Sequence, residues 1–105
     1  MKIILTENAE ENLWQIYRFH ADYSLDYANQ FQADLSEFIF SNLSQHPKMG
    51  TLYNPATSVY RMVYDGRYNV YYVLKNALYI VYILDGRMQL NVSLSDQPSD
   101  LPPIS

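Results

Sequence analysis

The sequence contains no cysteine, and this absence excludes disulfide frameworks, thiolate zinc sites and cysteine nucleophiles together. Its two histidines, His20 and His46, are too few and too isolated to indicate a metal site. No hydrophobic run approaches the length of a membrane span. The apolar start, residues 1–5, is too short for the core of a signal peptide because polar residues follow it at once. We therefore expect a cytoplasmic protein with no metal, no other cofactor and no membrane partner.

Basic residues are in the minority, and the net charge of −4 argues against a protein coated with positive charge for nucleic-acid binding. The charge is unevenly distributed. Residues 1–46 hold two basic and seven acidic side chains (2 − 7 = −5), whereas residues 47–90 hold five basic and two acidic ones (5 − 2 = +3). The last fifteen residues add two aspartates. One half is therefore acidic and the other mildly basic, a pattern that solvated surface also produces by chance.

The 105 residues, of which 49% are hydrophobic, suffice for one domain with one core. Residues 6–23 space their apolar side chains for one face of a helix, with Thr6 as the N-cap. Ser24 caps a second helix, which ends near His46 because Pro47 disfavours helical geometry before it. Two long helices joined by so short a turn form an antiparallel hairpin.

The periodicity changes after an irregular stretch, residues 47–57. Residues 58–64 are rich in β-branched and aromatic types, as strands are. A hairpin signal, Asp-Gly, separates them from a second strand over residues 67–74, and a third strand runs over residues 78–84. Three consecutive strands with tight turns form an antiparallel meander.

The N-terminal strand, residues 2–5, can join the edge of this meander, and the helical hairpin covers one face. We therefore predict an α+β fold with the hairpin packed on a three- to four-stranded antiparallel sheet. One domain occupies residues 1–90. The proline-containing tail, residues 91–105, has little that could pack and is predicted to be poorly ordered.

The residues at the joints of this predicted order resemble those of the RelE/ParE toxin superfamily. Residues 4–17, Ile-Leu-Thr-Glu-Asn-Ala-Glu-Glu-Asn-Leu-Trp-Gln-Ile-Tyr, resemble the start of ParE-type toxins, T-x-x-A-x-x-x-L-x-x-I. Residues 46–50, His-Pro-Lys-Met-Gly, are similar to the P-x-x-G loop after the second helix. The segments 60–61, 67–72 and 83–87 resemble the three sheet strands of the family. The resemblance covers about residues 2–88 and depends on the order and spacing of short motifs.

This resemblance implies a type II toxin that a cognate antitoxin holds inactive. RelE-like members cleave messenger RNA in the ribosomal A site, whereas ParE-like members inhibit DNA gyrase and are not nucleases. Cleavage through the ribose 2′-hydroxyl needs a base, an acid and cations that stabilise charge on the phosphate. Arg61, Arg67 and Arg87 are the candidate catalytic cations, and by resemblance Arg61 lies on the basic strand while Arg87 ends the last strand.

Three departures from the family pattern weaken the ribonuclease hypothesis. Asn69 replaces the arginine of the Y-R motif, and Asp85 stands where many nucleolytic members have histidine. The tail beyond Arg87 contains no tyrosine or histidine, where several ribonuclease members place a catalytic aromatic. The negative net charge also opposes binding to ribosomal RNA. We therefore favour a non-enzymatic ParE-like toxin, with a RelE-like endoribonuclease and a non-toxic, interaction-only relative as the alternatives.

The chain holds 11 tyrosines, and seven lie in the predicted meander. In the strand 67–74 both faces are largely apolar, which is more than a helical hairpin on one side requires. We expect the second face to receive either an antitoxin segment or a second copy of this chain. Four residues are predicted to bind the target or the antitoxin: Arg61, Arg67, Tyr71 and Arg87.

Overall fold

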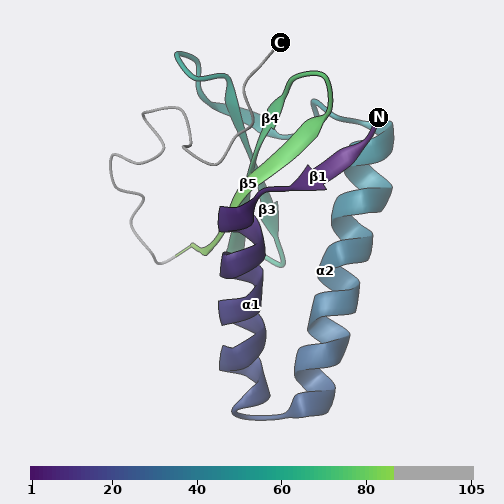
Figure 1. Ribbon diagram of the computed structural model, residues 1–105, viewed down its shortest axis with the longest axis vertical. Coiled ribbons are helices and arrows are strands. Elements are labelled where there is room, and N and C mark those ends of the chain that lie inside the picture. The colour runs from purple at the N-terminus through teal and green to yellow at the C-terminus, as the bar shows by residue number, and fades with distance from the viewer. Residues whose placement is uncertain (87–105) are drawn as a thin grey trace.

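The structure is a computed structural model that describes residues 1–86. A hairpin of two helices packs against one face of a five-stranded sheet (Figure 1). This arrangement confirms the predicted α+β class. The prediction of a poorly ordered tail concerns residues 91–105, which lie outside the described residues.

The two helices begin at the predicted caps. Helix α1 spans Glu7–Ala21, and the Thr6 hydroxyl accepts a hydrogen bond from the amide of Ala9. Helix α2 spans Leu25–Gln45, and the Ser24 hydroxyl accepts in the same way from the amide of Tyr27. These side chains satisfy amide groups that the first helical turn leaves unpaired. Because only a short turn joins them, the helices run antiparallel, as predicted (Figure 1).

The sheet contains the predicted meander and two further strands. Strands β3 (Val59–Tyr64), β4 (Tyr68–Leu74) and β5 (Leu78–Asp85) pair antiparallel. In the turn between β3 and β4, Asp65 and Gly66 have positive φ angles, 57° and 63°, and the Arg67 amide donates a hydrogen bond to the Tyr64 carbonyl oxygen at 3.1 Å, which closes the tight turn. The complete strand order is β1-β5-β4-β3-β2.

The predicted three- to four-stranded antiparallel sheet is wrong in two respects. Strand β1 (Ile3–Leu5) pairs parallel to β5, and the long connection that parallel strands need consists of the two helices and strands β2 to β4. Strand β2 (Thr51–Asn54) lies in the stretch predicted to be irregular and pairs antiparallel with β3. Strand β2 has only four residues and its side chains are largely exposed, so its sequence lacks the alternation of buried and exposed positions by which a strand is predicted. A register shift also interrupts its pairing with β3.

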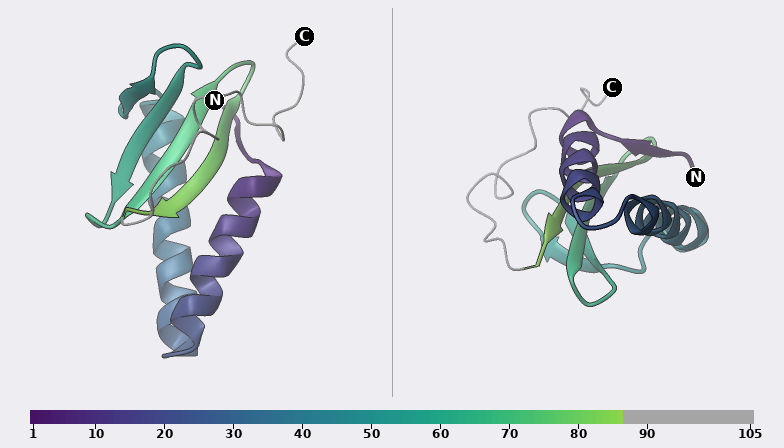
Figure 2. Two further views of the ribbon diagram at one scale, coloured as in Figure 1. Left: turned by 90° about the vertical axis from the view of Figure 1, so that its left-hand side faces the viewer. Right: turned by 90° about the horizontal axis from the view of Figure 1, so that it is seen from below.

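Apolar side chains fill both faces of the sheet, and Figure 2 shows that the helices cover only one of them. On β4, Tyr68, Val70 and Tyr72 belong to the cluster under the helices, while Tyr71 and Val73 belong to a second cluster on the opposite face. This alternation is the one that the sequence predicts. We refer to the face away from the helices as the far face.

Candidate functional site

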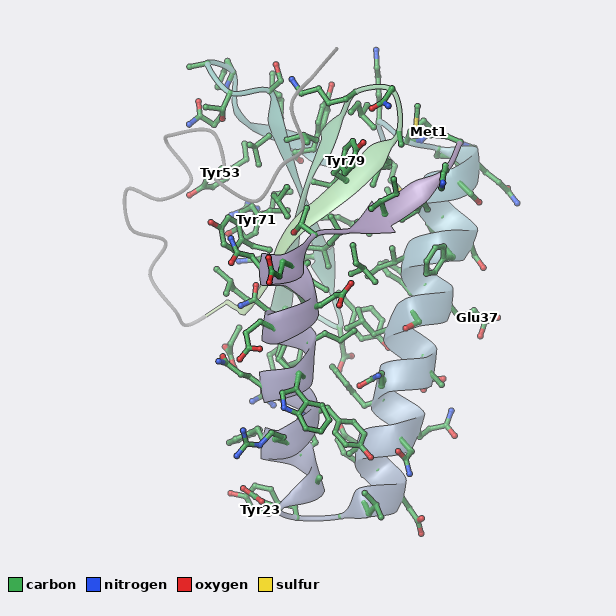
Figure 3. The ribbon with its side chains drawn as sticks, in the orientation of Figure 1. Met1, Tyr23, Glu37, Tyr53, Tyr71 and Tyr79 are labelled. Atoms are coloured by element: carbon green, nitrogen blue, oxygen red, sulfur yellow. The ribbon has the colours of Figure 1, made fainter. Side chains whose placement is uncertain are left out.

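Two of the predicted binding residues, Arg61 and Tyr71, lie next to each other on the far face. They are paired residues of the neighbouring strands β3 and β4, so both side chains point away from the helices. The Arg61 guanidinium lies 5.7 Å from the centre of the Tyr53 ring. The Tyr53 ring in turn meets the Tyr71 ring edge-on at 5.1 Å, and Figure 3 shows these two tyrosines close together. Arg61, Tyr53 and Tyr71 are called the far-face cluster below.

Within the far-face cluster Tyr71 is buried, whereas Tyr53 and Arg61 are exposed. Tyr71 is only 1% exposed, and burial raises the pKa of its hydroxyl, to which the neighbouring Tyr53 adds. The positive charge of Arg61 and hydrogen bonds from Asn69 and Arg61 act against this rise in the pKa. The phenol is therefore neutral at physiological pH and is held in place by polar neighbours.

Most apolar residues of the far face, among them Tyr71, Val73 and Val81, are buried within the chain, whereas Val63 is exposed. Strand β2 is the edge strand next to β3, and its Tyr53 side chain reaches across β3 on this face to contact Tyr71. A partner that approaches the far face meets Arg61, Val63 and Tyr53, which are exposed. Tyr71 would then act by fixing the position of Arg61.

Arg67 lies apart from the far-face cluster, at the end of the β3–β4 turn and under the helices. Its Nε donates a hydrogen bond to Asp85 Oδ2 at 3.2 Å, which also forms an ion pair. Its guanidinium lies 5.7 Å from the centre of the Phe19 ring and 5.1 Å from the centre of the Tyr68 ring. Ring contacts and the ion pair together fix this arginine, because guanidinium groups stack well on aromatic faces.

His20 is a central residue of the same region that sequence reasoning treated as structural. The side chain is 5% exposed, and its Nε2 lies 2.9 Å from the Tyr68 hydroxyl. The rings of Phe31 and Tyr27 pack against it. Burial lowers the pKa of His20, and the positive charge of Arg67 lowers it further. His20 is therefore neutral near pH 7, and its place in the apolar stripe of α1 was the signal for this role.

The helices project past the end of the sheet (Figure 1). A depression of about 860 Å³ lies between the projecting part of the hairpin and the end of the sheet. Four side chains of the hairpin line one wall, and turn and strand residues of the sheet line the other. The lining residues are Phe19, His20, Tyr23, Tyr27, Gly66, Arg67, Asp85 and Gly86. We refer to this space as the hairpin-end depression. Figure 3 shows one of these lining residues, Tyr23, at the turn of the hairpin.

These placements separate the groups that cleavage of RNA would need to combine. The exposed cation, Arg61, belongs to the far face, whereas His20 is buried under the helices and Arg67 is paired with Asp85. Arg87, the remaining candidate, lies outside the described residues. Among residues 1–86, no three histidine or acidic side chains come close enough to hold a metal ion. No helix in this part of the chain has the length and apolarity that crossing a membrane requires.

No protein-family model matches the sequence, and no curated protein is significantly similar to it. The function must therefore be argued from the resemblance of short motifs and from the geometry of the two sites.

Proposed function

We propose that this chain is the toxin component of a type II toxin–antitoxin pair, of the kind that stabilises plasmids or gene cassettes. In this proposal it is a ParE-like toxin that inhibits a macromolecular target, such as DNA gyrase, by binding to it. A cognate antitoxin neutralises it. Two features support the proposal: the order of motifs that resembles the RelE/ParE superfamily, and the arrangement of a helical hairpin on one face of a meander.

The separation of cation and histidine is the observation that favours binding over cleavage. A ribonuclease must place a proton acceptor, a proton donor and a cation around one phosphate. Here the neutral amide of Asn69 lies beside Tyr71, and His20 bonds to the Tyr68 hydroxyl under the helices. Asp85 neutralises Arg67. Of these groups, only the uncharged Asn69 lies on the far face with Arg61, whereas His20, Arg67 and Asp85 lie under the helices.

Arg61 is the group that we assign to target or antitoxin binding on the far face. Its guanidinium is exposed, is oriented by Tyr53 and Tyr71, and offers several donors in a planar array. Arginines with aromatic neighbours are typical of residues that dominate the energy of protein interfaces. A second copy of the chain is the other partner that this surface could accept. Arg87 and Arg67 remain part of the proposed binding set.

Induction of the chain in bacterial cells tests the proposal. We expect growth arrest, relief of the arrest when the short frame encoded beside the chain is co-expressed, and a weaker arrest for Arg61→Ala. Arg18→Ala is the matched control, because Arg18 is an exposed arginine on α1, away from the far face. Growth that is unaffected by induction of a soluble, folded chain would contradict the toxin assignment.

A RelE-like ribonuclease is the second hypothesis, and one observation favours it. The hydrogen bond between Arg61 and the Tyr71 hydroxyl places a cation and a phenol together on the far face. Mapping of messenger RNA ends in a translating extract decides between the two toxin types. Site-specific cleavage that is lost in Arg61→Ala or Arg87→Ala would support the ribonuclease. If neither translation nor gyrase responds while the chain still binds its neighbour, the interaction-only alternative is correct.

A further inference from the structure

The hairpin-end depression exposes more aromatic surface than packing requires. Tyr23 is 82% exposed, and Phe19 and Tyr27 are each about half exposed. The Phe19 and Tyr23 rings meet edge-on at 5.8 Å, and the Tyr27 ring meets His20 edge-on at 5.1 Å. Aromatic rings grouped in a concavity, with glycine on the opposite wall, are typical of a binding surface.

The charges around the depression favour a positively charged occupant. Asp22, Asp26 and Asp65 are exposed and directly precede the lining residues Tyr23, Tyr27 and Gly66. The lining pair Arg67 and Asp85 cancels in charge. Counted in the same way along the sequence, two cations are neighbours of lining residues, Arg18 before Phe19 and Arg87 after Gly86, so carboxylates are in the majority, three against two.

Arg67 shows how this corner of the molecule holds a cation. Its guanidinium lies near the faces of Phe19 and Tyr68, and a carboxylate accepts from its Nε. The outer part of the depression has exposed rings, Tyr23 and Tyr27, and Asp22 and Asp26 are their neighbours in the sequence; Arg67 is the cation among the described lining residues, and it is paired with Asp85. Tyrosine rings attract ammonium and guanidinium groups through their negative faces.

We propose that the hairpin-end depression binds a lysine or arginine side chain of a partner polypeptide. The rings of Tyr23 and Tyr27 contact the cation, and Asp22 and Asp26 attract it. The occupant is a cationic segment, because the surrounding carboxylates repel an anionic one. This inference does not depend on the toxin assignment, since it rests on Tyr23, Tyr27 and their neighbouring aspartates; only the lining residue Arg67 also belongs to the proposed binding set.

Nuclear magnetic resonance titration of the labelled full chain tests the proposal. The probe is the peptide acetyl-Leu-Arg-Leu-amide, and acetyl-Leu-Glu-Leu-amide is its matched anionic control. We expect the arginine peptide to shift the ring resonances of Phe19, Tyr23 and Tyr27, and the shifts to weaken as salt is added. The glutamate peptide should leave them unchanged.

Variants locate the site. Tyr23→Ala should weaken binding of the arginine peptide by about two- to fivefold, the effect of one exposed cation–π contact. Asp22→Asn with Asp26→Asn should weaken it as well and reduce its salt dependence. Trp14→Ala is the control, because Trp14 is an exposed aromatic elsewhere on α1, stacked on Tyr17. Its removal should leave binding unchanged.

Four outcomes would overturn the proposal. The first is equal binding of the two peptides, and the second is the absence of any shift at millimolar arginine peptide. The third is a set of shifts centred on Trp14. The fourth is dimerisation that Tyr23→Ala abolishes, which would make a second copy the occupant. Growth arrest and peptide binding are separate measurements, so failure of this inference leaves the proposed function untouched, and the reverse holds as well.

Discussion

Arg61 and Arg67 show how position changes the meaning of the same residue type. Arg67 is held by two rings and by Asp85, so its charge is already compensated within the chain. Arg61 is exposed, and its neighbours orient it. The sequence places both arginines in or next to the meander, but the face of the sheet on which each side chain lies decides whether it can contact a partner. The alternation of side chains along β3 sets the face for Arg61, and the β3–β4 turn sets it for Arg67.

His20 makes the stability of the fold depend on pH. Its pKa in the folded state is lowered from 6.5, so the folded state binds fewer protons than the unfolded state. Its contribution is fully present above about pH 6.5 and is lost as the pH falls toward the folded-state pKa. We expect the free energy of unfolding, measured by chemical denaturation, to fall between pH 7.5 and pH 5.5.

The variant His20→Gln should flatten this dependence, although it also lowers stability at pH 7.5 through loss of the contact with Tyr68. The titratable and charged groups that face His20 are Arg67, Tyr68 and Tyr27. His46→Gln is the control and should retain the slope. An unchanged slope in His20→Gln would refute the assignment.

Gly50 is a residue whose missing side chain matters for packing. A Cβ atom there would lie 2.7 Å from the Tyr72 hydroxyl and 2.8 Å from the Arg61 carbonyl oxygen. The Gly50 amide also donates to the same hydroxyl at 3.0 Å. We expect Gly50→Ala to destabilise the fold by about 1–3 kcal/mol in denaturant unfolding, the usual cost of overpacking.

Gly66→Asn is the matched comparison. Gly66 has a φ of 63°, which asparagine tolerates, and nothing lies within 4 Å of its Cβ position. Its effect should stay within about 0.5 kcal/mol, as for ordinary surface changes. Equal effects of the two variants would show that the close approach of Gly50 to Tyr72 is not a constraint.

The helices and strands were predicted correctly where a local sequence signal marks them, and incorrectly where they depend on pairing between distant parts of the chain. Thr6, Ser24 and the Asp65–Gly66 turn are local signals, and the helices and the meander begin and turn where these residues indicate. The direction of β1 depends on contacts with β5 more than seventy residues later, as the register Ile3↔Leu78 shows. Strand β2 is short and exposed, so only its pairing with β3 identifies it.

The two N-caps are expected to differ in strength. Ser24 caps α2 at an exposed turn, so Ser24→Ala should cost about 1 kcal/mol. The buried Thr6 caps α1 and also donates its hydroxyl to the carbonyl oxygen of Ile80 at 2.9 Å, which ties α1 to β5. Thr6→Ala should therefore cost clearly more, about 2 kcal/mol. Thermal or denaturant unfolding measures both, and a larger loss for Ser24→Ala would contradict this account.

At the scale of the whole molecule, the sequence indicated the two chemically distinct halves but not the surfaces that they form. The predicted set of binding residues divides, because Arg61 and Tyr71 share the far face while Arg67 lies beside His20. The hairpin-end depression was not predicted, since it arises where the helices project past the sheet. Neither helix length nor sheet length alone reveals that overhang.

The molecule as a whole is proposed to act by occupying a target rather than by cutting one. The direct test is a supercoiling assay with purified DNA gyrase, relaxed plasmid and increasing amounts of the full chain. We predict inhibition that saturates near equimolar amounts of chain and gyrase, with weaker inhibition by Arg61→Ala and unchanged inhibition by Arg18→Ala. Full supercoiling at a large excess of folded chain, together with cleavage of messenger RNA on ribosomes by the same preparation, would contradict the account.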